Sequence, residues 1–299
     1  MDCKGDRVMG YQAVFKRYEI KYMITAEQKE AILRAMEPYM EMDKFGRSTI
    51  RNIYYDTDDY ILARHSIAKP DFKEKLRVRS YALADADSTV FVELKRKYDH
   101  VVYKRRTGLA EADAMKWMAG AGSGAAAAEK GSAQVASEID WFLDTYKGIR
   151  PALFLSYDRE AFRMKAGADE FDGGRDFRVT FDENILCRDY DISLRSEAYG
   201  ERILEPGKVL MEIKCAGGIP LWMTEVLSAE HVYKTSFSKY GTAYQTMIFP
   251  AMTQKTGSFA AEAAVSAMEA ELASARERKR AKERRRRLHL GFGRQGASA

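Results

Sequence analysis

The segment KEKLRVRSY at residues 73–81 alternates as a β-strand does, and one of its two faces carries only cations. That face holds Lys73, Lys75, Arg77 and Arg79. Successive residues on one face of a strand stand about 6–7 Å apart, so four like charges would lie in one row. A strand face that merely meets water usually mixes signs, hydroxyls and amides. The segment therefore constrains the fold, because something must compensate this row of charge.

The same feature recurs in other strand-like segments. For any one strand, the ordinary interpretation is the solvent face of a half-buried antiparallel sheet. Like charges on adjacent strands repel, so the repetition is tolerable only if anions, a metal or the interspersed glutamates compensate it. A closed or nearly closed sheet, with charged faces inward and apolar faces outward beneath helices, would supply such a site for a polyanion. The further faces are Arg17, Glu19 and Lys21; Glu93, Lys95 and Lys97; Tyr157 and Arg159; Arg178, Thr180 and Asp182; and Glu212 and Lys214, while segment 101–107 carries Tyr103 and Arg105 on one side and Lys104 and Arg106 on the other.

Strand-like alternation dominates the body of the chain, and helical segments punctuate it. A helix is predicted to begin at Thr25, where Gln28 would complete a capping box. Strands in sequential runs with interspersed helices predict an α+β fold with an antiparallel sheet. The predicted strands are 14–22, 50–56, 72–81, 89–97, 101–107, 152–163, 176–182 and 208–215, and further helices are predicted at 111–119, 135–147, 220–230 and 237–248.

The net charge of +5 is unevenly distributed along the 299 residues. Residues 256–299 hold ten Lys/Arg against five Asp/Glu, which leaves 39 of each in the rest of the chain. The body is therefore not a generally basic surface of the kind that coats nucleic acid, and we expect no specific nucleic-acid partner. If the body binds an anion, its cations must be concentrated in one place.

Two segments stand apart in composition. Residues 120–132 (GAGSGAAAAEKGS) are of low complexity and are interpreted as a flexible excursion between two helices. The tail at 256–299 is helix-prone and contains the run RERKRAKERRRR at 276–287. Two interpretations of the tail stay open: a solubilising, frayed helix, or a contact with an anionic membrane, a membrane protein or polyphosphate.

The sequence has neither a run of about 18 apolar residues nor an N-terminal apolar stretch typical of a secretory signal. Its three cysteines are too scattered for a disulfide framework or a zinc site. The default prediction is a cytoplasmic protein, which would lie at the inner face of the membrane if the tail binds there. No phosphate-binding G-x-x-x-x-G-K-[ST] loop, HExxH or G-x-S-x-G motif is present.

Nine motifs together resemble the VTC-type polyphosphate polymerase domain, of the CYTH-like superfamily of triphosphate tunnel metalloenzymes. The resemblance runs in order over residues 11–250. It implies an antiparallel β-barrel tunnel that is lined with cations and a few acids and covered by helices. The motifs are RYEIKY (17–22), IRNIYYDT (50–57), SIAKPDFKEKLRVRSY (66–81), VFVELKRK (90–97), YKRR (103–106), LSYDREAF (155–162), FRVTFD (177–182), LMEIK (210–214) and KTSFSKYG (234–241).

The resemblance implies ATP-dependent synthesis of inorganic polyphosphate, in which the γ-phosphoryl group passes to a growing chain with the help of Mn²⁺ or Mg²⁺. ATP and inorganic polyphosphate would be its partners. Carried over residue by residue, the resemblance implies catalytic roles for Arg77, Arg79, Lys95 and Arg159; phosphate binding by Lys21, Lys104, Tyr157, Arg178, Lys234, Ser238 and Lys239; and metal binding by Glu212, with Glu19 and Glu93 either further ligands or mere counter-charges for neighbouring lysines.

Two alternatives to the polymerase stay open. The first is a tripolyphosphatase or nucleoside triphosphatase of the same fold; such relatives usually carry E-x-E-x-K in the first strand, where this chain has Arg17 in place of the first Glu. The second is a non-catalytic polyphosphate-binding module. Glu212 argues against that alternative, because a binder needs cations but no catalytic metal.

Overall fold

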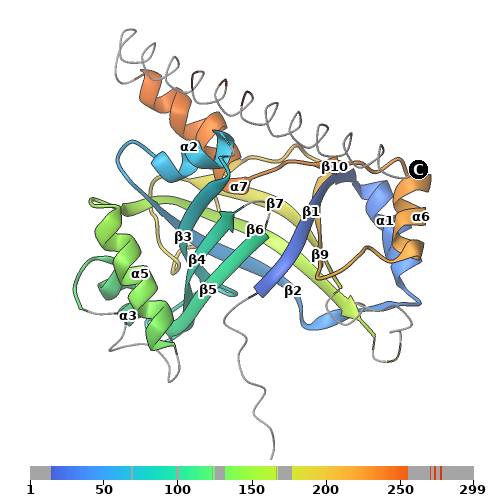
Figure 1. Ribbon diagram of the computed structural model, residues 1–299, viewed down its shortest axis with the longest axis horizontal. Coiled ribbons are helices and arrows are strands. Elements are labelled where there is room, and N and C mark those ends of the chain that lie inside the picture. The colour runs from blue at the N-terminus through green and yellow to red at the C-terminus, as the bar shows by residue number, and fades with distance from the viewer. Residues whose placement is uncertain are drawn as a thin grey trace, which may run out of the picture.

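A computed structural model describes residues 15–68, 70–98, 101–122, 124, 132–165, 167, 177–254, 270, 273 and 277 (Figure 1). Its strands are β1 (Phe15–Thr25), β2 (Met40–Asp56), β3 (Phe72–Ser80), β4 (Thr89–Tyr98), β5 (Val101–Ala110), β6 (Arg150–Met164), β7 (Arg178–Arg188), β8 (Glu201–Arg202), β9 (Lys208–Cys215) and β10 (Lys234–Thr235). Its helices are α1 (Ala26–Met36), α2 (Ile61–Ala68), α3 (Glu111–Met118), α5 (Ala133–Thr145), α6 (Leu221–Ala229), α7 (Lys239–Ala243) and the π-helix η2 (Tyr244–Ile248).

The strands form one sheet in which every described pairing is antiparallel. The order runs β10-β1-β5-β4-β3-β2-β6-β7-β8, and β9 pairs with β1 along one edge and with β7 along the other. The pairings can therefore be followed from β1 through β5, β4, β3, β2, β6, β7 and β9 back to β1. The predicted α+β class with an antiparallel sheet is confirmed.

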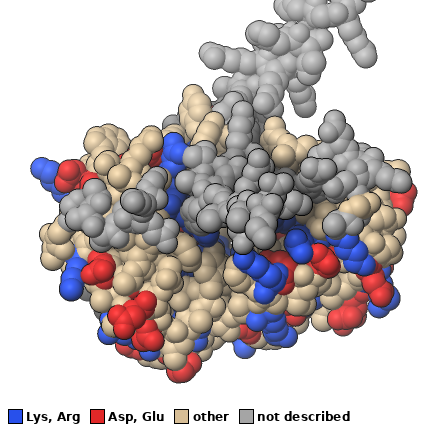
Figure 2. All heavy atoms as spheres, turned by 90° about the horizontal axis from the view of Figure 1, so that it is seen from below, with Lys and Arg blue, Asp and Glu red and all other residues tan. Residues whose placement is uncertain are grey.

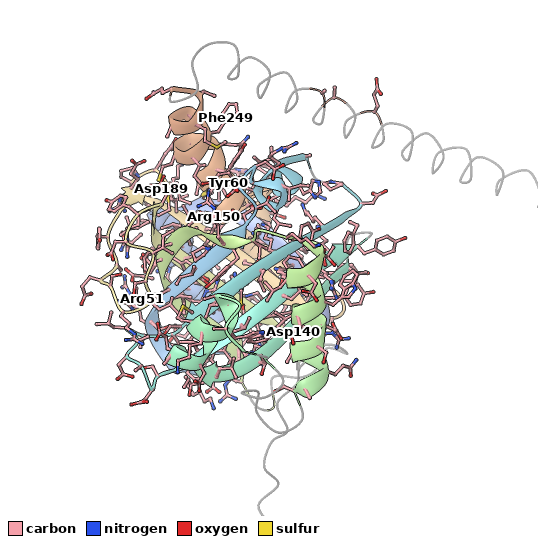
Figure 3. All side chains as sticks on the ribbon, turned by 90° about the vertical axis from the view of Figure 1, so that its left-hand side faces the viewer. Arg51, Tyr60, Asp140, Arg150, Asp189 and Phe249 are labelled. Atoms are coloured by element: carbon pink, nitrogen blue, oxygen red, sulfur yellow. The ribbon has the colours of Figure 1, made fainter. Side chains whose placement is uncertain are left out.

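The apolar faces of the strands pack beneath helices. Leu76 and Val78 of β3 and Val92 of β4 lie in one buried cluster with Trp117 of α3 and Phe142 of α5. Figure 3 shows α5, marked by Asp140, lying across these strands. A second cluster places the apolar residues of β1, β7 and β9 beneath α1 and α6, on the other side of the molecule in Figure 1. The helices thus cover the sheet from outside and leave its charged faces to line the interior.

Part of the interior is apolar, which the alternation of charged residues did not predict. Leu153 and Leu155 of β6 lie on the same face of their strand as Arg159. They pack in a third buried cluster with Tyr240 of α7 and Tyr244 of η2. The segment of α7 and η2 therefore fills one part of the space between the strands, and the charged residues occupy the rest.

Local signals explain several of the boundaries. The Thr25 side chain accepts a hydrogen bond from the Gln28 backbone at 3.2 Å, and the Gln28 side chain accepts one from the Thr25 backbone at 3.0 Å, so the predicted capping box is confirmed. Helix α2 is unpredicted; the amides of Leu62 and Ala63 in its first turn donate to the buried carboxylate of Asp56. Strand β2 begins at Met40, ten residues before the predicted strand at 50–56.

Most of the excursion at 120–132 and nearly all of the basic tail lie outside the described residues. Among the residues that are described, no helix combines the length and the apolar character needed to cross a membrane.

Candidate functional site

The charged faces of the strands converge on a cavity of about 410 Å³. Of the described residues, twelve basic side chains but only two carboxylates line it. The face drawn in Figure 2 is different, because basic and acidic side chains are interspersed over its visible part. The cations of the cavity are Lys21, Lys73, Lys75, Arg77, Arg79, Lys95, Lys97, Lys104, Arg159, Lys214, Lys234 and Lys239, and its carboxylates are Glu19 and Glu212.

We call the twelve cations that line the cavity the wall. Glu93 of β4 lies behind these cations, and its side chain is 0% exposed. Its Oε2 accepts a hydrogen bond from Arg77 Nε at 2.8 Å, and Lys104 Nζ lies 2.5 Å from its Oε1. Burial alone would raise the pKa of Glu93, but Lys104, Arg77 and Arg79 hold it well below its usual range. Glu93 is therefore a buried counter-charge that holds the cations of β3 and β5 in place.

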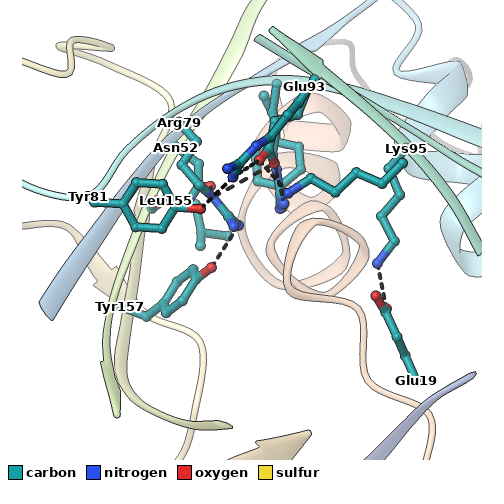
Figure 4. Close-up of polar contacts among 12 residues, drawn as sticks. Glu19, Asn52, Arg79, Tyr81, Glu93, Lys95, Leu155 and Tyr157 are labelled. Atoms are coloured by element: carbon teal, nitrogen blue, oxygen red, sulfur yellow. Dashed lines mark hydrogen bonds and ion pairs between the residues drawn. The ribbon is translucent and has the colours of Figure 1, made fainter. Parts of the chain in front are cut away.

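Arg79 of β3 reaches along the inner face of the sheet to the neighbouring strand β2 and to β6 beyond it (Figure 4). Its Nε donates to Asn52 Oδ1 at 2.9 Å, and its Nη2 donates to the Tyr157 hydroxyl at 2.9 Å. Burial would raise the pKa of Tyr157, but Arg159, Arg79 and Lys239 lower it to about 8. The Tyr157 hydroxyl thus lies in a strongly positive environment, which favours its ionised form.

Asp182 of β7 is a second buried carboxylate behind the cations. It accepts hydrogen bonds from Arg159 Nε at 2.6 Å and from Arg159 Nη2 at 2.7 Å, a bidentate pair. Its Oδ2 also accepts from Lys239 Nζ at 2.5 Å. Burial would raise the pKa of Asp182, but Arg159 and Lys239 hold it far below its usual range. Asp182 therefore fixes two cations that line the cavity from β6 and α7.

The two cavity carboxylates lie on neighbouring strands. Glu19 of β1 accepts from Lys95 Nζ at 2.6 Å, also visible in Figure 4, and Glu212 of β9 lies 3.0 Å from Lys214 Nζ. Burial and the Glu212 charge would raise the pKa of Glu19, but Lys95 and Lys214 hold it below its usual value. Burial would raise the pKa of Glu212, but Lys214 and other cations hold it well below its usual range. Both groups are thus anionic at neutral pH and close enough to influence each other.

The loop before α7 brings further groups to the cavity. Lys21 Nζ donates to the Phe237 carbonyl at 2.7 Å, and Lys75 Nζ donates to Ser238 Oγ at 3.0 Å. Ser238 is the N-cap of α7 and accepts from the Gly241 amide at 3.0 Å. Burial lowers the pKa of Lys21 to about 8, although Glu212 opposes this effect. The motif SFSKYG thus forms one side of the cavity because its serine caps a helix there.

Two carboxylates of the cavity fit a divalent ion. No group of three or more His, Cys, Asp or Glu side chains with metal-binding geometry exists among the described residues. Glu19 and Glu212 both line the cavity and sense each other's charge. A hard cation held by two carboxylates takes its remaining ligands from phosphate oxygens and water, as Mg²⁺ commonly does. Glu93 does not fit as a ligand, because it does not line the cavity and both its oxygens face cations.

The structure brings most of the predicted site residues together. Arg178 is an exception, since it is exposed at the start of β7 and does not line the cavity, and Glu93 lies behind the wall. The predicted residues that line it are Lys21, Arg77, Arg79, Lys95, Lys104, Tyr157, Arg159, Lys234, Ser238, Lys239, Glu19 and Glu212.

The site assignments carried over from the resemblance left out four lining lysines and Asp182. The alternation had already placed Lys73, Lys75, Lys97 and Lys214 on the cation faces, and all four line the cavity. For Asp182 the alternation gives no role, because an acid at the end of FRVTFD gives no indication of its partners.

Solved structures of similar shape have low sequence identity to this chain. A candidate adenylate cyclase from Vibrio parahaemolyticus is 11% identical with a TM-score of 0.39, covering 75% of this chain and 96% of its own. A candidate adenylyl cyclase from Hippeastrum with a dominant triphosphatase activity is 13% identical with a TM-score of 0.41, covering 78% and 96%. The Mimivirus capping enzyme triphosphatase is 9% identical with a TM-score of 0.31, covering 72% and 86%. No curated protein sequence matches the chain.

The family comparison covers most of the chain. Residues 16–248 match the VTC domain, from the start of β1 to the end of η2, and this range includes every residue that lines the cavity. The chain therefore belongs to the VTC domain family.

Proposed function

We propose that the protein synthesises inorganic polyphosphate from ATP in the cation-lined cavity. The observation that carries this proposal is the composition of the lining, in which twelve cations face two carboxylates. Such a lining costs electrostatic energy unless a polyanion occupies it, and membership of the VTC family indicates a polyphosphate-related substrate. In this proposal the strands that pair in succession from β1 back to β1 enclose a tunnel for the chain.

The proposed reaction makes one bond and breaks one. An oxygen of the terminal phosphate of the chain attacks the γ-phosphorus of ATP, and the bond between that phosphorus and the β-phosphate oxygen breaks to release ADP. The attacking oxygen is already ionised, so no general base is required. Catalysis then depends on positioning and on stabilisation of the negative charge, which is what a wall of fixed cations supplies.

The arginines and lysines have separate roles in this proposal. Arg77, Arg79 and Arg159 present planar guanidinium groups, which can bind phosphate oxygens through two parallel hydrogen bonds. Glu93 and Asp182 hold these groups in place from behind. Lys21 and Lys95 add point charges. The orientation of each cation is therefore set before the substrate enters, which removes the cost of ordering it in the transition state.

Glu19 and Glu212 are the residues that would hold Mn²⁺ or Mg²⁺. The bound ion would neutralise charge on the phosphate oxygens that it contacts. Lys95 and Lys214 pair with these carboxylates, so both lysines would be free to bind phosphate groups if the carboxylates held an ion.

The test is incubation of the purified chain with ATP and Mn²⁺ or Mg²⁺, followed by gel separation of polyphosphate and measurement of ADP. Long chains together with ADP support the proposal. Free phosphate without chains would instead indicate a triphosphatase, and tight polyphosphate binding without turnover would indicate a binding module. Arg77→Gln and Glu212→Gln should lower the rate by about 100-fold or more, whereas Lys116→Gln, on the exposed face of α3, is the matched control.

A further inference from the structure

A second hollow lies on the outside of the sheet, between α5 and the strands that this helix crosses (Figure 3). Its volume is about 570 Å³. Helix α5 contributes Gln134, Glu138 and Trp141, which are four and then three residues apart and therefore share one face of the helix. Phe72 of β3 forms part of the opposite side. The hollow is separate from the cation-lined cavity, because alternate residues of a strand point to opposite faces of the sheet.

Large aromatic side chains are exposed around this hollow. Trp141 is 61% exposed and Phe72 is 47% exposed. The strand register places Tyr98 directly opposite Phe72, and it places Tyr103 directly opposite Arg96 on the same outer face. We name Phe72, Tyr98, Tyr103 and Trp141 the outer aromatic patch. A contiguous exposed apolar patch of this kind marks a surface that binds another molecule.

The charged groups beneath the outer aromatic patch neutralise one another. Arg96 Nε donates to Glu74 Oε1 at 2.6 Å, and Arg96 Nη1 donates to Glu138 Oε2 at 3.3 Å. Arg105 Nε donates to the same oxygen of Glu138 at 3.2 Å. Two arginines thus face two carboxylates, and their net charge is zero. The patch therefore suits an apolar partner surface, whereas a charged ligand would gain little there.

A second copy of this chain offers such a surface. Each copy carries the projecting indole of Trp141 directly beside the hollow. The volume of the hollow lies within the range of pockets that enclose whole small ligands, about 300–1,000 Å³, so an indole fits. About a twofold axis, Trp141 of each copy enters the hollow of the other, and the contact closes on itself without propagating. The neutral floor spares the two patches the repulsion that a net charge would cause.

The exposed area of the patch is of the right order for a weak dimer. Its four aromatic side chains are 38–61% exposed. Because a buried aromatic side chain removes about 150–250 Å² from water, the four together supply about 400 Å² per copy. A specific interface buries about 800 Å² per partner. The exposed polar side chains of the rim, such as Gln134 and Ser137, would contribute to the remainder.

We propose that the outer aromatic patch is the interface of a symmetric homodimer, in which Trp141 of each copy fills the hollow of the other. The dissociation constant should lie in the micromolar range, because the apolar area is modest. The interface lies on the outside of the sheet and the cation-lined cavity lies inside it. The proposal is therefore independent of the proposed function, and the cavity stays accessible in the dimer.

The test is sedimentation-velocity ultracentrifugation of the full chain across the micromolar range, where we expect a reversible equilibrium of monomer and dimer. Trp141→Ser should raise the dissociation constant by about 30-fold or more, since a buried interface tryptophan is a typical hot spot. The matched control is Leu221→Ser, which removes a 69% exposed side chain from α6 and should leave the constant unchanged. A monomer at every concentration, or equal dimerisation of the wild type and the Trp141 variant, would overturn the proposal.

Salt distinguishes this interface from association through the basic tail at 276–287. An apolar contact persists at about 1 M salt, where the screening length is only about 3 Å. Glu138→Gln gives the patch a net positive charge and should weaken the dimer by about fivefold at low salt. High salt should restore the dimer of this variant, because it screens the repulsion. A wild-type association that high salt abolishes would contradict the proposal.

Acrylamide quenching of tryptophan fluorescence reports on the contact itself. Trp117 is buried, whereas Trp141 is exposed and open to the quencher in the monomer. The quenched fraction of the wild type should therefore fall as its concentration rises through the dissociation constant. The quenched fraction of Trp141→Ser should not change with concentration. A wild-type chain that dimerises while its quenching stays constant would show that the indole lies outside the interface and would reject the proposal.

Discussion

Arg159 and Asp182 form a bidentate pair in the interior, with Arg159 Nε and Nη2 at 2.6 and 2.7 Å from the two carboxylate oxygens. Lys239 donates to the same carboxylate from α7. One buried acid thus connects β6, β7 and α7, the helix that begins at Lys239. Removing one partner of a buried ion pair leaves an uncompensated charge, which is strongly destabilising.

Asp182→Asn should therefore lower the free energy of unfolding by about 3 kcal/mol, at the lower end of the usual range because Arg159 faces a cavity that water can enter. It should also raise the KM for ATP, since the two cations lose their fixed orientation. Urea unfolding and steady-state kinetics measure the two effects. Unchanged kinetics in a folded variant would show that the pair has no positioning role.

Glu93→Gln and Glu212→Gln separate a counter-charge from a metal ligand. Glu93 faces Arg77 and Lys104 from behind the wall, so its variant should lose stability and keep its affinity for Mn²⁺. Glu212 lines the cavity, so its variant should bind Mn²⁺ about tenfold or more weakly. Titration of Mn²⁺ followed by electron paramagnetic resonance measures the Mn²⁺ affinity of each variant and does not require enzymatic turnover. Equal Mn²⁺ affinities in both variants would contradict the assignment.

Anion affinity and protein stability should depend on pH in opposite directions. Burial lowers the pKa of Lys21 and of Lys104 to about 8, against the attraction of Glu212 and of Glu93. Both lysines lose their charge as pH rises through that value, so tripolyphosphate should bind more weakly. Between about 8 and the usual lysine value near 10.4 the unfolded chain binds more protons than the folded one, so the stability of the empty protein should rise.

Lys104→Arg provides the control for this pH dependence, because arginine stays protonated across the range. The loss of tripolyphosphate affinity at high pH should then be smaller than in the wild type. Calorimetry for binding and thermal melting for stability measure the two trends. Parallel trends would mean that these lysines do not control binding.

Tyr240→Phe tests how α7 is held against the cavity. The Tyr240 hydroxyl donates to Asp56 at 2.6 Å, and its ring stacks on Tyr54 with centroids 4.6 Å apart. Loss of a buried hydrogen bond to a charged group should cost about 1.5–3 kcal/mol. Because Ser238 and Lys239 precede Tyr240, the KM for ATP should also rise. A variant with reduced stability and an unchanged KM would limit the tyrosine to a structural role.

The alternation of charged residues predicted much of the site, because the period of a strand fixes which side chains share a face. It identified Arg77 and Arg79 on β3 and Lys95 on β4, all of which line the cavity. The capping box at Thr25 is an equally local signal, and it predicted the start of α1.

Other features depend on contacts that no local pattern encodes. Glu93 and Asp182 sit on the same strand faces as the cations, and only the register of the paired strands, which sets Glu93 opposite Arg77 and Asp182 opposite Arg159, shows which cations they neutralise. Helix α2 depends on hydrogen bonds to Asp56, and the sequence pattern identified Asp56 only as the last residue of a predicted strand. The early part of β2 contains Gly46 at φ 59° and an irregular register, which obscured its alternation.

The position of β1 has a consequence for how the chain folds. This first strand pairs with β5, β9 and β10, and its most extensive pairing is with β9, the last long strand of the sheet. Most of the described chain must therefore be synthesised before β1 gains that partner. Such distant pairing slows folding and leaves a strand edge exposed meanwhile. A nascent chain that stops short of β9 would thus present an unpaired β1 on the ribosome, where the cell's chaperones must shield it.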